Sequence, residues 1–450
     1  MAQVNRPNFL FISTDQQNIS AMGAYGNPHL ETPNMDRIAA DGVRFTNSYC
    51  TSPLCSPARA SFLTGLFPHR TGVKWNHASL KPGLPQLGEF LRHAGYDTAW
   101  AGKWHVPGEY PVSPDAIPGF YNLPILGRTT EGGDYPVKVA GRDDGWKHNL
   151  GVYVDEPVAK TAAAFLRREH RGPFMLAVSL MNPHDICFPS EHFRAGPVRD
   201  SDLPPLPVNF GFDPEEPELL ISTRFTHEGS SKIAEQWDER GWREAMRIYY
   251  RFTQAADRAV GIVLDALEES GLERDTVIVY TSDHGEGNAS HRWFGKLSLY
   301  EESAAVPFIV SRKGATPAGE ADTERLVSAC DILPTILGYA GIEQPEGLDG
   351  QDLGPLIGDK SLRGREYVGC ALYPVWEKSN LEGRMIRTRQ FKYTVFSPGA
   401  RPEMLFDLRQ DPGETRNLAR DPHFCAELEK HRAMLKDWIS RTEDSFVIPA

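Results

Sequence analysis

Polar residues follow directly on the ends of four apolar, β-branched segments, and no other feature of the sequence constrains the fold as strongly. The segments FLFIST, TAWAG, MLAVSLMNP and VIVYTS run into Asp15-Gln16, Lys103-Trp104-His105, His184-Asp185 and Asp283-His284, respectively. Helical patterns lie between these segments, which predicts βαβ units and a mostly parallel sheet. Because ligands bind beyond the carboxyl ends of strands in open parallel sheets, these polar residues are expected to meet at one edge.

The predicted elements divide the chain into two parts. We expect strands at 8–14, 97–102, 174–180, 276–282 and 306–310, and helices within 84–95, 158–170 and 242–270. Residues 107–150 and 186–240 are rich in Pro, Gly and Asp, and are interpreted as excursions that cover a site. After about residue 365 the pattern changes to antiparallel strands and a terminal helix at 422–440. The prediction is a large α/β domain sandwiched by helices (1–365) and a small α+β domain (366–450).

Composition excludes several classes of protein. The chain has 450 residues, of which 40% are hydrophobic, and a formal net charge of −12. It has no long run of Lys and Arg, so neither nucleic acid nor a membrane surface is expected as a partner. No apolar window reaches the roughly 20 residues that span a bilayer, and no secretory signal precedes the first strand, so a cytoplasmic location is expected. Six scattered cysteines do not form a disulfide framework.

The stretch CTSPLCSPARASFLTG at 50–65 places a cysteine at the mouth of a predicted helix. Pro57 fits the first turn, where its missing N–H removes no hydrogen bond, and Ala58 to Leu63 continue the helix. Cys55 then lies at the N-terminus and Arg59 lies one turn further along the same face. The positive end of this helix is expected at the same sheet edge as the polar residues.

The polar residues at the strand ends include the donors of a cation site. Asp15, Gln16, Asp283 and His284 offer carboxylate, amide and imidazole groups, a mostly oxygen set that suits a hard divalent cation such as Ca²⁺. Taken singly, the neighbouring residues also fit structural roles: Lys103 and Lys296 as solvated lysines, His105 as a core histidine and His184 as a cap. Their coincidence at four strand ends favours a site.

The ordered motifs resemble the type I sulfatases of the alkaline phosphatase superfamily. CSPAR at 55–59 matches the C-x-P-x-R signature of that family, and ASFLTG continues it. STDQ, GKWH, NPH, SDHGE and GKLSLYEES follow the family order, and TPNMDRIAADGVRFTNSYC and LFDLRQDPGETRNLA are also similar to family segments. The resemblance covers nearly the whole chain except the two excursions.

This resemblance implies a role for each site residue. In sulfatases the signature cysteine, here Cys55, is oxidised by a formylglycine-generating maturation enzyme that recognises the positions of Pro57 and Arg59. The aldehyde hydrate is the nucleophile, and residue 55 completes the metal shell. Gln16 departs from the commoner second aspartate, which leaves the site more positive and the metal more loosely held. The remaining implied roles are contacts to sulfate oxygens by Arg59, Lys103 and Lys296, general acid for the leaving alcohol by His184, and proton removal from the hydrate by His105.

The implied function is hydrolysis of a sulfate ester by S–O cleavage, as in arylsulfatases. Asn76, His77 and His291 are candidate substrate contacts. The main alternative is a phosphonate monoester or phosphodiester hydrolase of the same superfamily, or an enzyme active on both classes, although such enzymes usually lack the Lys and His of GKWH. A binding protein without activity is disfavoured because every catalytic position is filled. Aryl, choline, carbohydrate and alkyl sulfates, Ca²⁺, Mg²⁺ and Mn²⁺, and a monomer or homo-oligomer all remain compatible with the sequence.

Overall fold

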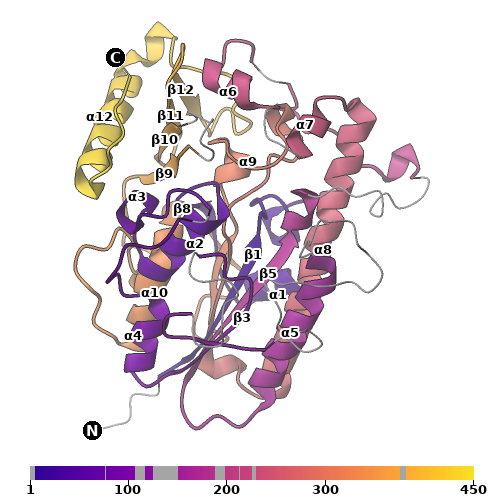
Figure 1. Ribbon diagram of the computed structural model, residues 1–450, viewed down its shortest axis with the longest axis vertical. Coiled ribbons are helices and arrows are strands. Elements are labelled where there is room, and N and C mark those ends of the chain that lie inside the picture. Colours follow the sequence, from indigo (N-terminus) through magenta and orange to yellow (C-terminus); the bar gives the residue numbers. More distant parts are fainter. Residues whose placement is uncertain are drawn as a thin grey trace.

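A computed structural model shows two sheets that pack against helices. It describes residues 6–76, 78–106, 117–124, 151–187, 198–211, 213–225, 230–374 and 382–449. Figure 1 shows the large sheet in the lower part of the molecule and the small sheet with the C-terminal helix at one end. Most of the first excursion, together with His77, lies outside the described residues.

The large sheet has eight strands in the order β4-β3-β5-β1-β6-β7-β2-β8. Their bounds are β1 Asn8–Asp15, β2 Gly42–Tyr49, β3 Asp97–Gly102, β4 Tyr121–Asn122, β5 Phe174–Pro183, β6 Thr276–Ser282, β7 Phe308–Ser311 and β8 Glu320–Ser328. β1 lies between β5 and β6 and is parallel to both, so the expected mostly parallel sheet is confirmed.

One expected strand runs in the opposite direction to its neighbours. β7 is antiparallel to both β6 and β2. The chain returns from β6 to β7 through a loop and the four-residue helix α9 (Glu301–Ala304). A connection without a long crossover helix brings the next strand back antiparallel.

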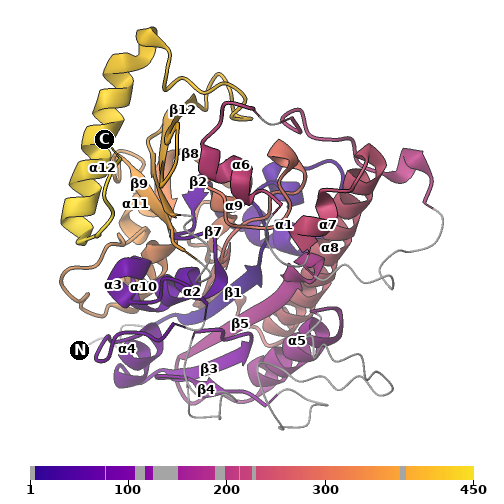
Figure 2. The same ribbon diagram turned by 45° about the horizontal axis from the view of Figure 1, so that its top comes forward.

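Helices cover both faces of the large sheet (Figures 1 and 2). Phe9 and Phe11 of β1 belong to the cluster on the side of α2, α4 and α10, whereas Leu10 and Ile12 belong to the cluster on the side of α1, α5 and α8. This alternation follows from the period of two in a strand. The helix bounds are α1 Pro33–Ala40, α2 Cys55–Thr64, α3 Pro68–Thr71, α4 Leu87–His93, α5 Gly151–Arg167, α6 Glu218–Thr223, α7 Ser230–Ala234, α8 Glu239–Glu269, α10 Ile332–Ala340, α11 Gly354–Gly358 and α12 Cys425–Thr442.

The small sheet is fully antiparallel, in the order β12-β11-β10-β9. One face packs on α12, where Trp438 and Leu435 join its core, and the other shares a core with Tyr49 and Leu299. The division at residue 365 stays a prediction, although the two sheets lie on either side of it. The strands are β9 Val368–Leu372, β10 Glu382–Arg387, β11 Phe391–Ser397 and β12 Glu403–Asp407.

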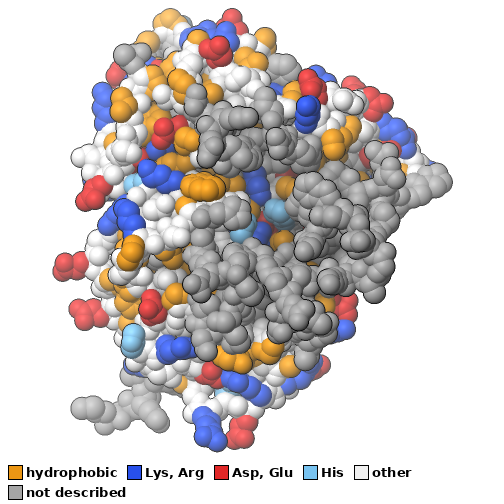
Figure 3. Space-filling view, viewed as in Figure 1, with side chains coloured by type: hydrophobic (Ala, Val, Ile, Leu, Met, Phe, Trp, Pro, Cys, Tyr) orange, Lys and Arg blue, Asp and Glu red, His pale blue; other side chains and the backbone are white. Residues whose placement is uncertain are grey.

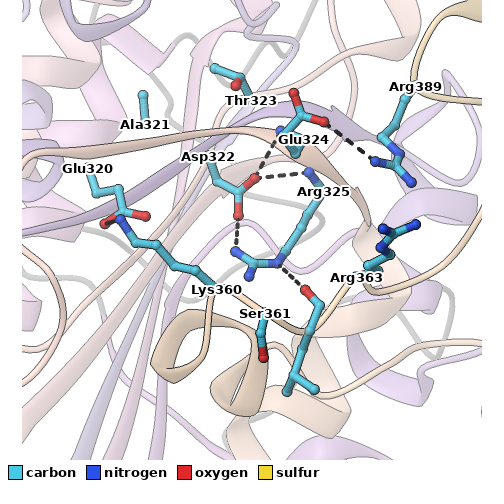
Figure 4. A pocket seen from close by; sticks show the side chains of 11 residues that line it. Glu320, Ala321, Asp322, Thr323, Glu324, Arg325, Lys360, Ser361, Arg363 and Arg389 are labelled. Atoms are coloured by element: carbon cyan, nitrogen blue, oxygen red, sulfur yellow. Dashed lines mark hydrogen bonds and ion pairs between the residues drawn. The ribbon is translucent and has the colours of Figure 1, made fainter.

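Charged side chains protect the outer edge strand β8. They line a surface pocket of about 510 Å³, shown in Figure 4. Asp322 pairs with Arg325 at 2.6 Å, and Glu324 pairs with Arg389, which follows β10, at 3.5 Å. Paired charges on an edge strand disfavour pairing with another chain. Among the described residues, no helix is both long and apolar enough to cross a membrane.

Candidate active site

The ends of β1, β3, β5 and β6 bring their polar residues together around Asp15. Lys103 Nζ lies 2.6 Å from Asp15 Oδ2, and His184 Nε2 lies 3.9 Å from Asp15 Oδ1. Asp283 is joined to Asp15 through Arg59, which contacts both carboxylates. Figure 3 shows Lys or Arg and His side chains together in a hollow near the middle of the face that is turned toward the viewer. The expected convergence at one sheet edge is therefore observed.

The helix that begins at Cys55 is fixed to the site at its first turn. Leu54 is extended and gives no side-chain cap. Instead, the N–H of Ser56 donates to Oδ1 of Asn76 at 3.0 Å, and the Ser56 hydroxyl donates to the His105 carbonyl. All ten residues of α2 are buried. Asn76, a candidate substrate contact, thus supplies the acceptor that the N-terminus of this helix requires.

Cationic groups surround the Cys55 thiol. Its Sγ lies 3.2 Å from His284 Nε2, 3.2 Å from Lys296 Nζ and 3.8 Å from Asp15 Oδ1. Burial raises the pKa of Cys55, but Lys296, Lys103 and His284 outweigh burial and hold it well below its usual range. A side chain that carries negative charge is therefore stabilised at position 55.

Arg59 joins the two carboxylates at the bottom of the site. Its Nη2 lies 2.9 Å from Asp15 Oδ2 and its Nε lies 2.8 Å from Asp283 Oδ2, and the guanidinium is 3% exposed. Nη1 donates to Ser179 Oγ at 2.7 Å. Such a bridge fixes the direction of both carboxylates and compensates their charge in a buried place.

Gln16 has a left-handed backbone, with φ of 69°, which is uncommon for a residue other than glycine. Its N–H donates to Asp283 Oδ1 at 3.0 Å and its carbonyl accepts from the Tyr249 hydroxyl at 2.8 Å. These bonds hold a strained conformation of the kind that occurs at functional sites. The backbone of Gln16 is thereby fixed beside Asp283, and its side chain contacts Lys296.

The donors at this centre fit a hard divalent cation. Ligand atoms of Asp15, Cys55, Asp283 and His284 lie within 4.8 Å of one another, and all four residues are buried. His284 Nδ1 donates to the Gly285 carbonyl at 2.9 Å, so Nε2 faces Cys55 and can offer its lone pair to a cation when the ring is neutral. Two carboxylates and one imidazole of the predicted donor set are thus grouped with Cys55, whereas the amide oxygen of Gln16 accepts from Lys296 at 3.0 Å. The role of these residues as metal ligands stays a prediction.

Two further histidines interact with the Cys55 side chain, as the sequence analysis expects of catalytic residues. Burial and Lys103 lower the pKa of His105 to about 4, and burial and Lys296 lower that of His184 to about 4. Asp155 of α5 positions the segment before His184, because its carboxylate accepts the N–H groups of Met181 and Asn182 at 2.7 and 2.9 Å.

Some residues of the site carried no readable signal in the sequence. Ser179, Asp155 and Tyr249 act through contacts that only the fold creates, whereas Glu286 stands in the motif SDHGE beside two expected ligands. His291 stacks on Tyr300 and lines a cavity of about 390 Å³ next to β12. A substrate contact through His291 stays a prediction.

Asp283→Asn should weaken the binding of a divalent cation by at least about 10-fold, because even the partners of metal ligands typically contribute that much. Asparagine keeps one oxygen but loses the charge that a cation requires. The measurement is the metal content after dialysis against graded chelator. Asp275→Asn, an exposed position just before β6, is the matched control and should retain the metal. Equal retention by both variants would remove Asp283 from the cation site.

Comparison with known proteins identifies the family of the chain. The family model "Sulfatase" matches residues 7–342, and "N-sulphoglucosamine sulphohydrolase, C-terminal" matches residues 289–441. A Delta 4,5-hexuronate-2-O-sulfatase of Bacteroides thetaiotaomicron is 32% identical over 98% of this chain and 90% of its own length. The chain is also similar to the solved structure of a 2-O GAG sulfatase, with a TM-score of 0.86, 30% identity and coverage of 99% and 95%.

A phosphonate monoester hydrolase of Agrobacterium radiobacter shares the fold, with a TM-score of 0.80, 25% identity and coverage of 97% of this chain and 96% of the other. The 2-O GAG sulfatase structure has the higher identity and TM-score of the two, and the sulfatase family model matches residues 7–342. The chain therefore belongs to the sulfatase family and is a sulfuric ester hydrolase.

Proposed function

We propose that this sulfatase removes a sulfate group from a sugar, with residue 55 in its formylglycine form as nucleophile and Ca²⁺ as the cation. The observation that carries the proposal is the buried cluster in which Cys55 lies 3.2 Å from Lys296 and 3.8 Å from Asp15. One residue at a helix mouth thus faces both the carboxylates of a cation site and the basic groups that suit a tetrahedral anion.

The residues around position 55 have separate roles in hydrolysis. A hydroxyl of the aldehyde hydrate loses its proton to solvent and attacks sulfur, the S–O bond to the sugar breaks, and the sugar oxygen takes a proton from His184. His105 then takes the proton of the second hydroxyl, the C–O bond to sulfate breaks, and the aldehyde is restored. Asp15, Gln16, Asp283 and His284 would hold the divalent cation, which would lower the pKa of the attacking hydroxyl and offset the charge of the sulfate.

The low pKa of free His184 is compatible with its role as an acid. Lys296 and Lys103 contribute to lowering this pKa to about 4. A bound sulfate ester brings negative charge close to the imidazole of His184. This charge favours the protonated ring and therefore raises the pKa of His184 in the complex. The protonated form is then favoured when the leaving oxygen develops its charge.

Two observations support a sugar as the alcohol. The relatives described above are named for sulfates on hexuronate and on glycosaminoglycan. Within this chain, Trp75 is 46% exposed and precedes Asn76, whose side chain binds the first turn of α2. An exposed indole one residue from the cap of the nucleophile's helix offers an apolar face for a sugar ring.

A panel of substrates tests this function, with enzyme whose aldehyde content at position 55 has been verified. It compares kcat/KM for a 2-O-sulfated unsaturated hexuronate disaccharide, a 6-O-sulfated N-acetylglucosamine, choline sulfate, 4-nitrophenyl sulfate and an aryl phosphonate monoester. We expect one of the sugar sulfates to have the highest value. A preference for choline sulfate would exclude a sugar, and a preference for the phosphonate would make the chain a phosphonate hydrolase.

His184→Ala should slow the hydrolysis of sugar sulfates by about 10²- to 10⁴-fold, the usual contribution of a general acid. Hydrolysis of 4-nitrophenyl sulfate should slow much less, because nitrophenolate leaves readily without a proton. The measurement is kcat for both substrates. His93→Ala on α4, an exposed histidine, is the control. Equal losses on both substrates would remove the acid role from His184.

A further inference from the structure

The side chain of Gln16 is held between partners of opposite kinds. Its Nε2 donates to Glu286 Oε2 at 2.5 Å, and its Oε1 accepts from Lys296 Nζ at 3.0 Å. The thiol of Cys187 lies near both ends of the amide, 3.1 Å from Nε2 and 3.3 Å from Oε1, and can accept from the first or donate to the second. A primary amide has one donating and one accepting end, so these neighbours decide which end faces Cys55. Here the accepting oxygen faces Lys296, whose Nζ also lies 3.2 Å from Cys55 Sγ.

Glu286 is itself rigidly held. It is fully buried, and its Oε1 accepts the backbone N–H of Gly295 at 2.5 Å and that of Asn288 at 3.3 Å. One carboxylate oxygen is thus engaged by two backbone donors, and the other receives the Gln16 amide. All the groups that Glu286 faces at these contacts are donors, which a carboxylate satisfies and an amide cannot satisfy at both ends.

We propose that Glu286 is a positioning residue that orients the Gln16 amide, so that Oε1 faces the cation site and Nε2 faces away from it. The pair also divides the charge: the acid stands at position 286 and the neutral amide at position 16. Two carboxylates at these positions would meet as acceptors with no proton between them. The inference rests on the proposed cation site and does not depend on the substrate.

Glu286→Gln changes one atom and forces a conflict between donors. If the new amide keeps its oxygen on the N–H groups of Gly295 and Asn288, its NH₂ meets the NH₂ of Gln16. Gln16 must then turn, which points its NH₂ at Lys296 and the cation. If the new amide turns instead, its NH₂ meets the backbone N–H groups. Either arrangement loosens the amide oxygen from the cation site.

The swap Gln16→Glu with Glu286→Gln should restore the arrangement. The carboxylate introduced at position 16 would accept from the new amide with one oxygen and face Lys296 and the cation with the other. The new amide at position 286 meanwhile keeps its oxygen on the two backbone donors. Shape, hydrogen-bond count and net charge all equal those of the original pair. A merely structural role of the charge at position 286 predicts no such rescue.

The test measures Ca²⁺ affinity by calorimetric titration of metal-stripped protein, with thermal midpoints recorded in the absence of Ca²⁺. We expect Glu286→Gln to weaken Ca²⁺ binding by about 10- to 100-fold, the usual effect of losing a partner of a metal ligand. The swap should regain at least about 10-fold of that loss. Asp257→Asn is the matched control, because Asp257 is a buried carboxylate whose Oδ1 accepts the backbone N–H groups of Asn34 and Met35 and whose Oδ2 accepts the Asn34 amide, not that of Gln16.

The outcomes separate this inference from the proposed function. Wild-type affinity in Glu286→Gln would overturn the role of Glu286 alone. A loss that the swap does not rescue, or an equal loss in Asp257→Asn, would also overturn it, since the effect would then not pass through Gln16. A wild-type protein that binds no Ca²⁺ would contradict both the cation site and this inference, whereas a preference for another substrate would leave the Glu286 result unchanged.

Discussion

Cys55→Ala should reduce the turnover of a sulfate ester by at least about 10⁴-fold, because removal of a nucleophile leaves only binding and electrostatic stabilisation. The fold should remain intact. Cys55 lies in the first turn of α2, and alanine keeps both its Cβ and a good helix propensity. The thiol lies among Lys296, His284 and Lys103, and these basic groups remain in place in the variant. An anion can still bind to them.

The measurement is kcat on a good aryl sulfate, with circular dichroism and the thermal midpoint as checks of folding. Cys425→Ala is the control, since Cys425 is an exposed thiol at the start of α12. It should retain full turnover. Turnover by folded Cys55→Ala at the wild-type rate would exclude residue 55 as the nucleophile.

Arg59→Met should destabilise the protein by about 3–5 kcal/mol, because removing one partner of a buried ion pair leaves uncompensated charge. Two carboxylates lose their shared partner here, Asp15 at 2.9 Å and Asp283 at 2.8 Å. Activity should fall as well, since the two carboxylates would no longer be held in one orientation. Methionine keeps much of the side-chain volume, so the effect reports charge and hydrogen bonding rather than a cavity.

The deficit of Arg59→Met should grow as pH rises. Burial and Asp15 already raise the pKa of Asp283 to about 6. Without Arg59 the folded-state pKa of Asp283 rises further above its unfolded value, whereas that of Asp15, which lies well below its usual range, rises only toward it. The folded variant then binds more protons than the unfolded chain, and stability is lost as pH rises through that window.

Thermal midpoints at about pH 5 and about pH 8, both with chelator, test this sign. The control is Arg167→Met, which breaks an ion pair with Glu269 whose side chains are 49% and 60% exposed. An exposed pair contributes at most about 1 kcal/mol, so this variant should be nearly neutral at both pH values. A deficit in Arg59→Met that is equal at both pH values would contradict the charge argument.

The strands whose side chains are apolar on both faces could be predicted from the sequence. β1, β3, β5 and β6 are buried along most of their length and therefore read as apolar runs. β8 is the edge strand and carries Glu320, Asp322 and Glu324. β2 lies beside it and has the sequence GVRFTNSY, so neither strand gives an apolar run. The direction of β7 could not be read, because apolar character is the same in a parallel and an antiparallel strand.

The residues of the site also divide into those that the sequence predicts and those that it does not. Residues at strand ends, such as Asp15 and Asp283, could be placed together because a parallel sheet aligns its carboxyl ends. Partners that approach from elsewhere could not: Asn76 reaches the first turn of α2 from a loop, and Asp155 reaches the segment before His184 from α5. Their roles depend on packing between elements distant in sequence, which no local pattern records.

The mass spectrum of the tryptic peptide Phe45–Arg59 from active enzyme tests the central claim most directly. Fragment ions separate residue 55 from Cys50 in the same peptide. An aldehyde at position 55 has lost one sulfur and two hydrogens and gained one oxygen relative to the thiol. We predict that this form is present and that turnover rises in proportion to its fraction across preparations. Full turnover from protein in which residue 55 is entirely unmodified cysteine would contradict the account.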